Sequence, residues 1–220
     1  MQRNKRFVAS YSGGKDSVLA IYRAMCQGYT PVQLLITYDT DKGRTWFHGI
    51  PEDLLQVISD SINIPIRLIK TNGDDYNQCF ENALADAKCL GAEVCVFGDI
   101  DIADHKVWCV ERCRSAGIEA FLPLWGEARE KLVYEFIDSG FSSDITIIDT
   151  SRMSAEFLGK RLTREIVKEI CGQGVDICGE NGEYHSFVYN GPIFKQPVRF
   201  GFGDKVIVNG YAVLPLERLD

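Results

Sequence analysis

The stretch that decides the fold is residues 10–17, Ser-Tyr-Ser-Gly-Gly-Lys-Asp-Ser, which joins a short apolar run at 7–10 to a helical pattern over about 17–27. Two adjacent glycines, Gly13 and Gly14, let the backbone turn sharply and bring its N–H groups close to a ligand. The unpaired N–H groups and the positive dipole end of the following helix point back at the same place. An anion site is therefore predicted, with these contact residues: Ser10, Ser12, Gly13, Gly14, Lys15, Asp16 and Ser17.

The spacing around Lys15 separates this loop from a Walker A phosphate loop. A Walker A loop needs Gly-x-x-x-x-Gly-Lys followed by Ser or Thr, whereas Ala9 takes the first glycine position here and Asp16 follows Lys15. Because a carboxylate beside a polyphosphate is costly unless a divalent cation neutralises both, Asp16 is predicted to bind Mg²⁺. The alternative is a tight strand-to-helix turn with an N-cap. The full pattern favours the anion site.

Alternating strand-sized and helical segments predict the architecture of the first two-thirds of the chain. Strands are expected near 7–10, 32–38, 66–69, 94–97, 118–121 and 144–148, and helices near 17–27, 52–62, 75–90, 103–116 and 127–139. Apolar strands without internal alternation, separated by amphipathic helices, indicate a parallel sheet covered on both faces. We therefore expect a doubly wound α/β domain over residues 1–150.

The composition changes after about residue 149. Glycines become frequent, and the pairs Asn181-Gly182 and Asn209-Gly210 are typical of hairpin turns. The second pair is flanked by apolar runs at 205–208 and 211–216, which strengthens the hairpin prediction. We expect a small β-rich, substrate-binding subdomain over residues 151–220.

Charge and hydropathy argue against several functions. The net charge of −7 argues against non-specific nucleic-acid binding, which needs a basic surface. The longest apolar runs are far shorter than the ~20 residues of a membrane span. The run at 7–10 leads directly into a glycine turn, without the apolar region and cleavage site of a signal peptide. We expect a soluble, cytoplasmic protein with no membrane partner.

The eight cysteines show no Cys-x-x-Cys pair. Cys109 and Cys113 are four residues apart in a helical pattern and would share one face, which leaves a metal-binding pair open. Reduced, buried thiols are the favoured interpretation for the cysteines.

Further contact residues are expected where the parallel strands end, because ligands bind beyond the carboxyl ends of such strands. Tyr38 ends the second strand and could border a bound ligand, and Gly98 stands at the mouth of the fourth. A simple strand terminator is the alternative for Gly98. Asp99 and Asp101 are two carboxylates suited to metal or substrate contact. His48 could line the site or lie in a surface loop, and the sequence does not decide between them.

Residues 12–17 resemble the Ser-Gly-Gly-x-Asp-Ser signature of the PP-loop ATP pyrophosphatases, a superfamily of HUP type. It includes NAD and GMP synthetases, asparagine synthetase and tRNA-thiolating enzymes. In that superfamily the loop holds the β,γ-pyrophosphate of ATP as leaving group while a substrate oxygen attacks the α-phosphorus. The resemblance implies ATP as cofactor, an adenylated intermediate, and release of AMP and pyrophosphate.

A second motif, Cys-Gly-Glu-Asn-Gly-Glu-Tyr-His-Ser-Phe-Val at 178–188, is similar to the C-terminal signature of the diphthine–ammonia ligase family. The segments at 98–100, 122–125 and 190–194 match the same family in order. Ser186 stands where family members typically carry Thr. The resemblance implies that a carboxylate acceptor, diphthine on a translation elongation factor, is activated by ATP and aminated by ammonia.

The residues of this second motif also suggest chemistry by themselves. In a plain hairpin, Glu180 and Glu183 would flank the turn as close like charges, which is unfavourable. Two carboxylates beside Tyr184 and His185 instead suit a cationic ligand or proton transfer from an attacking amine. The predicted catalytic residues are Lys15, Asp16, Glu180 and Glu183. The predicted substrate-binding residues are His48, Asp101, Tyr184 and His185.

Three functions remain after this reasoning. An ATP-dependent amide-forming ligase is favoured by both motifs together. A tRNA-modifying enzyme with the same loop is weakened by the acidic chain and by the absence of a Cys-x-x-Cys pair in the sequence. A passive ATP-binding sensor would not require the carboxylates of the second motif.

Overall fold

The computed structural model describes residues 4–219 and resolves into two compact units. The first unit contains the chain up to Ser12 together with Asp16–Trp46 and Asn63–Gly126. The second contains Gly13–Lys15, Phe47–Ile62 and the chain from Glu127 onward. The main change of unit therefore falls near residue 126, earlier than the cut at 150 that the sequence suggests, and two short N-terminal segments belong to the second unit.

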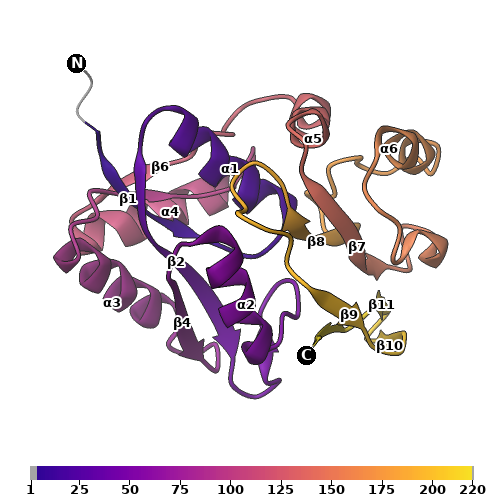
Figure 1. Ribbon diagram of the computed structural model, residues 1–220, viewed down its shortest axis with the longest axis horizontal. Helices are drawn as coiled ribbons and strands as arrows, with labels where there is room; N and C mark the ends of the chain where they lie inside the picture. Colours follow the sequence, from indigo (N-terminus) through magenta and orange to yellow (C-terminus); the bar gives the residue numbers. More distant parts are fainter. Residues whose placement is uncertain (1–3, 220) are drawn as a thin grey trace. The chain divides into compact units, whose positions relative to one another are not determined.

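A mainly parallel sheet forms the first unit (Figure 1). Its strands are β1 (Arg6–Ser10), β2 (Thr30–Asp39), β3 (Arg44–Thr45), β4 (Ile66–Thr71), β5 (Val94–Val96) and β6 (Glu119–Phe121). The parallel strands lie in the order β4-β2-β1-β5-β6, and β3 pairs antiparallel with the end of β2. The order reverses between β1 and β5, which makes the ends of these two strands the switch point where such sheets bind ligands. The doubly wound α/β fold is confirmed.

Helices pack on this sheet through apolar stripes. The helices of the first unit are α1 (Lys15–Cys26), whose first residue is grouped with the second unit, α3 (Tyr76–Cys89) and α4 (Ala103–Ala116). α3 and α4 lie side by side (Figure 1) and bury Phe80, Leu84 and Cys113 against strand residues such as Val8 and Leu35. Burying such side chains contributes about 1.5–3 kcal/mol each. One continuous core therefore supports the ends of β1 and β5.

Four of the eight cysteines are buried, three of them in this core and Cys178 in the second unit, and Cys79 is half-buried. Cys95, Cys109 and Cys113 are buried in the core as small apolar side chains. The expectation of burial is wrong for three other thiols, which are exposed: Cys26, Cys89 and Cys171.

The second unit is antiparallel and β-rich. Its strands are β7 (Ser142–Asp149), β8 (Tyr184–Asn190), β9 (Phe200–Phe202), β10 (Val206–Val208), β11 (Tyr211–Val213) and β12 (Leu216–Arg218). Its helices are α2 (Glu52–Ile62), α5 (Arg129–Asp138), α6 (Arg164–Cys171) and the short 3₁₀ turn η1 (Ala155–Phe157). One sheet has the order β10-β11-β7-β8, and β12 pairs with β9.

Two sequence expectations about these strands are wrong and one is confirmed. β7 does not extend the parallel sheet, because it pairs antiparallel with β8 and β11. Asn181-Gly182 lies in a turn before β8 rather than between two paired strands. The hairpin at Asn209-Gly210 is confirmed: both residues have positive φ, 51° and 83°, as a type I′ turn requires, and they join β10 to β11.

None of the helices within residues 4–219 combines the length and the apolar character that crossing a bilayer demands.

Candidate functional site

The phosphate loop, residues 12–17, is closed by hydroxyl groups in the first unit. The Ser12 N–H and the Ser12 hydroxyl both lie within hydrogen-bond distance of Ser17 Oγ, at 3.3 and 3.1 Å. These bonds tie the end of β1 to the first turn of α1. The helix N-terminus is thereby fixed directly after the two glycines, as an anion site requires.

Gly98, just after β5, is packed against the start of α1. A Cβ atom at Gly98 would lie 2.7 Å from the Ser17 nitrogen and 2.8 Å from the Asp16 carbonyl carbon. Both neighbours are backbone atoms, so they cannot move aside as a flexible side chain could. Gly98 therefore permits the two switch-point strands to bring their loops together, a packing role that neither sequence interpretation included.

Gly13 connects the phosphate loop to β8 within the second unit. Its carbonyl accepts a hydrogen bond of 2.9 Å from the Val188 N–H. Its φ of +86° lies in the region that glycine adopts readily, and a Cβ there would lie 2.4 Å from Ile50 Cδ1. Only glycine fits this position, and the loop backbone is held against β8.

The same unit gathers five of the predicted site residues, which we call the histidine cluster: Gly14, Lys15, His48, Tyr184 and His185. Lys15, only 6% exposed, places its ammonium 5.7 Å from the centre of the Tyr184 ring. The rings of His48 and His185 meet edge to face, with centroids 5.1 Å apart. A Cβ at Gly14 would lie 2.4 Å from His48 Cε1, so the loop backbone approaches that ring closely.

The electrostatic surroundings keep His48 neutral. Burial, and then the nearby charges of His185 and Lys15, hold the pKa of His48 well below its usual range. A hydrogen bond to the Ser186 backbone acts in the opposite direction but does not reverse the shift. An imidazole beside the phosphate loop is thus available in its uncharged form at neutral pH.

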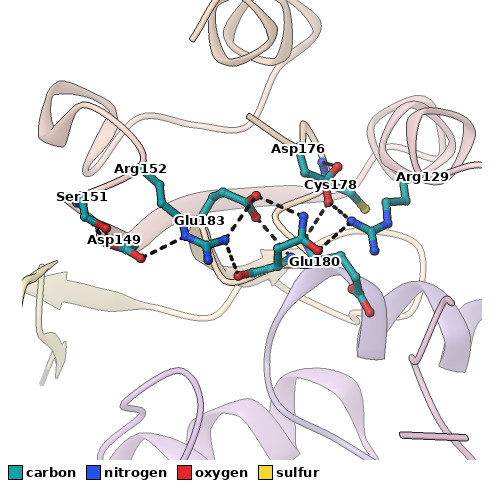
Figure 2. A network of polar contacts seen from close by, with 9 residues as sticks. Arg129, Asp149, Ser151, Arg152, Asp176, Cys178, Glu180 and Glu183 are labelled. Carbon is teal, nitrogen blue, oxygen red and sulfur yellow. Dashed lines mark hydrogen bonds and ion pairs between the residues drawn. The ribbon is translucent and has the colours of Figure 1, made fainter. Parts of the chain in front are cut away.

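The turn before β8 is held at one end by Asp176. Its carboxylate accepts the Cys178 N–H at 2.9 Å and the Glu180 N–H at 3.0 Å. It also pairs at 2.7 Å with Arg129, at the start of α5, and Arg129 donates to Asn181 Oδ1 as well. Figure 2 shows Arg129 reaching this end of the turn. Three donors on one carboxylate fix the backbone that carries Glu180.

Glu183 and Arg152 hold the other end of the turn (Figure 2). The buried Glu183 carboxylate accepts the backbone and side-chain N–H groups of Asn181, at 3.1 and 3.2 Å. Arg152 donates to the Asn181 carbonyl at 3.0 Å and lies 3.8 Å from Glu183. Both carboxylate oxygens of Glu183 therefore have structural partners, and the backbone N–H of Glu180, from the same predicted pair, is held by Asp176.

The sequence reasoning missed two residues of this turn and left a third without a role. Arg129 and Asp176 are far apart in the chain, and nothing in the sequence pairs them. Arg152 was given no role, and the structure assigns its side chain to the turn. A clue was present for Asp176: an Asp two residues before a glycine-rich turn often accepts local backbone N–H groups.

The remaining predicted residues lie in the first unit. Asp99 accepts from Cys109 at 3.5 Å and lies 3.1 Å from His105 Nδ1. Burial, and then Asp99 itself, raise the pKa of the Cys109 thiol, which keeps it protonated as the donor. Asp101 is exposed, and Tyr38 is buried with Lys70 over its ring.

No cluster of three or more His, Cys, Asp or Glu side chains within residues 4–219 has a metal-binding arrangement. A magnesium ion held mainly by nucleotide phosphates needs only one or two protein carboxylates. Asp16, in the first turn of α1, fits that requirement.

The doubly wound sheet, with a glycine-rich loop after the strand at its switch point, defines an α/β protein of the nucleotide-binding type of fold. Sequence models of the diphthamide synthase N-terminal domain and C-terminal domain match residues 5–120 and 128–214. These two matches span most of the chain. The chain belongs to the diphthamide synthase family.

The chain is also similar to individual curated proteins and to a solved structure. The diphthine–ammonia ligases of Rattus norvegicus and Homo sapiens are each 24% identical to the chain, over 97% of its length and 90% of theirs. A solved structure described as a predicted subunit of tRNA methyltransferase from Methanocaldococcus jannaschii gives a TM-score of 0.46 at 16% identity. That match covers 88% of this chain and 100% of the other.

The packing of Gly98 leads to the first prediction. Gly98→Ala should lower the free energy of unfolding by about 1–3 kcal/mol, because the added methyl group overpacks the start of α1. It should also weaken ATP binding, since the helix N-terminus shifts with the loop. Urea unfolding and calorimetric titration would measure the two effects. Gly172→Ala, at a helix end with φ −63°, is the control and should change neither by much. If Gly98→Ala changed neither the free energy of unfolding nor ATP binding, the packing role of Gly98 would be contradicted.

The low pKa of His48 gives a second prediction, about pH. In the unfolded chain His48 takes up a proton near its ordinary pKa of about 6.5, whereas in the fold it stays neutral to lower pH. The unfolded state therefore binds more protons below about pH 6.5, and stability should fall there by at most about 1.4 kcal/mol per pH unit.

Urea unfolding between pH 5 and pH 7.5 would measure this loss. His48→Gln should flatten the pH dependence over that range, because it removes the group whose pKa the fold holds well below its ordinary value. An equal slope in both proteins would show that His48 is not the group responsible.

Proposed function

We propose that the protein is an ATP-dependent amide-forming ligase that acts on diphthine. The carboxylate oxygen of diphthine attacks the α-phosphorus of ATP, the bond between the α-phosphorus and the β-phosphate oxygen breaks, and pyrophosphate leaves. Ammonia then attacks the acyl carbon of the adenylate, and AMP leaves with the electron pair of the carbon–oxygen bond. The products are diphthamide, AMP and pyrophosphate.

The observation that carries this proposal is the juxtaposition of the two sequence motifs. The Val188 N–H bonds to the Gly13 carbonyl, and Lys15 lies over the ring of Tyr184. A loop suited to phosphate is thus in direct contact with the segment that resembles the ligase family. A passive ATP sensor would not need this second segment beside its phosphate loop.

Each part of the loop has a role in this proposal. The N–H groups of Gly13 and Gly14 and the N-terminus of α1 bind the pyrophosphate. Lys15 balances the negative charge of the pyrophosphate, and Asp16 would hold the Mg²⁺ that accompanies ATP. That ion would neutralise the leaving group. Electrostatic stabilisation of this kind often supplies the largest part of an enzymatic rate enhancement.

The acceptor is proposed to meet the nucleotide at the turn before β8. Asp176 and Glu183 fix the two ends of this turn, which leaves Glu180 between two anchored points. A carboxylate attracts a positively charged group such as the quaternary ammonium of diphthine. We propose the diphthine-bearing elongation factor as the protein partner.

The products formed from ATP test the reaction class. With diphthine-bearing elongation factor and ammonium chloride, the protein should convert ATP to AMP and pyrophosphate, because the loop binds the β,γ-phosphates as a leaving group. Chromatographic separation of the nucleotides would measure the yield. Formation of ADP and phosphate, or AMP formation that depends on tRNA instead of the elongation factor, would refute the proposal.

The two glutamates of the turn should respond differently to substitution. Glu180→Gln should lower amide formation by about 10²–10³-fold, as loss of one well-placed electrostatic contact does, and leave the ATP dissociation constant within about threefold. Glu183→Gln should lower the free energy of unfolding by about 1–3 kcal/mol, because charge-assisted hydrogen bonds to Asn181 are lost. Rate assays and urea unfolding on both variants would show the contrast, and an active Glu180→Gln protein would exclude Glu180 from the reaction.

A further inference from the structure

His48 has an unusual hydrogen-bonding state. Its Nδ1 is buried and has no hydrogen-bond partner among residues 4–219. The bond between its ring and the Ser186 backbone must therefore use Nε2 as donor. Nδ1 is then the unprotonated nitrogen, with its lone pair unused.

An unpaired buried acceptor is costly to maintain. Leaving such a group without a donor costs about 1–3 kcal/mol, and native structures contain few of them. Packing against Gly14 needs only the shape of the ring and gives no reason for a nitrogen at this position. A ligand that donates a hydrogen bond would account for it.

The neighbours of Nδ1 restrict what that ligand can be. The imidazole lies against the Gly14 backbone and beside the charge of Lys15. Among the described residues, the other titratable group that influences the pKa of this ring is His185. A cationic donor such as ammonium would be repelled by Lys15, whereas a small neutral N–H donor would not. Ammonia meets both conditions.

We propose that His48 Nδ1 binds the attacking ammonia and accepts its proton. The inference rests on the proposed ligase function and assigns its second substrate to a particular atom. The ammonia lone pair forms the new C–N bond at the acyl carbon while the bond to AMP breaks. One N–H proton passes to Nδ1 and later to solvent, which leaves a neutral amide.

A weakly basic imidazole is sufficient for this step. When ammonia attacks, its nitrogen becomes positively charged, and its protons are then far more acidic than those of free ammonium. General-base assistance of this type contributes about 10²–10⁴-fold to rate. The same environment that keeps His48 neutral thus preserves its lone pair for the nucleophile.

Two nucleophiles distinguish proton acceptance from a structural role. His48→Phe keeps a ring against Gly14 but removes the acceptor. With diphthine-bearing elongation factor, it should lower kcat/KM for ammonium chloride at least 10²-fold. Hydroxylamine is a strong nucleophile that needs no base, so hydroxamate formation should stay within about threefold. Acceptor-dependent exchange of labelled pyrophosphate into ATP, which precedes amination, should also stay within about threefold.

Phe47→Ala changes the exposed neighbouring residue in the same loop and should behave as wild type in all three assays. A parallel fall of the ammonia and hydroxylamine reactions in His48→Phe would overturn the inference, since a misplaced adenylate affects both. An unchanged ammonia reaction would overturn it as well. If wild-type protein shows no acceptor-dependent pyrophosphate exchange, the proposed function fails and the inference with it. If exchange is present, only the inference is at stake.

Discussion

The hydrogen bond from the Val188 N–H to the Gly13 carbonyl is the contact on which the site depends. β8 begins at Tyr184 and His185, so a bond further along the same strand fixes where both side chains stand relative to Gly14 and Lys15. The bond can form only because the loop has no side chain at Gly13, where Ile50 fills the space. A backbone hydrogen bond of this kind uses groups that nearly every residue carries, so it fixes the position of β8 whatever side chains the strand has.

The turn before β8 explains how two acidic residues can stand close together. A buried carboxylate needs compensating donors, because leaving it unpaired would cost several kcal/mol. Two N–H groups of Asn181 supply these donors to Glu183, and the guanidinium of Arg152 adds a compensating charge 3.8 Å away. The repulsion between Glu180 and Glu183 that the sequence suggests is therefore offset by the partners of the Glu183 carboxylate. The start of β8 is rigid as a result, and its aromatic and imidazole side chains are held in place without help from a ligand.

Local signals made much of the fold predictable from sequence. The glycine loop, the alternation of strands and helices, and the hairpin at Asn209-Gly210 each depend on neighbouring residues only. β7 could not be placed, because a short segment with three isoleucines among polar residues is compatible with a strand in either kind of sheet. Its partners are set by contacts with β8 and β11, which lie far along the chain.

Long-range pairing limited the prediction of the site in the same way. The sequence identified Lys15, His48, Tyr184 and His185 but could not show that they form one cluster. The packing role of Gly98 also depends on an approach between loops more than 80 residues apart, which no local pattern encodes. Residue types were therefore enough to predict which side chains belong to the site, but not how these side chains are arranged in space.

The charge of Lys15 connects the two halves of the proposed reaction. An ammonium beside His48 lowers the pKa of the imidazole, and a bound polyphosphate would offset part of that charge. The basicity of His48 would then rise only while the loop holds the anion. Because the acyl adenylate forms during the same occupancy, the proton acceptor would be strongest when there is an intermediate to aminate. The ring of Tyr184, whose centre lies 5.7 Å from the Lys15 ammonium, favours this position of the charge beside the phosphate loop and His48.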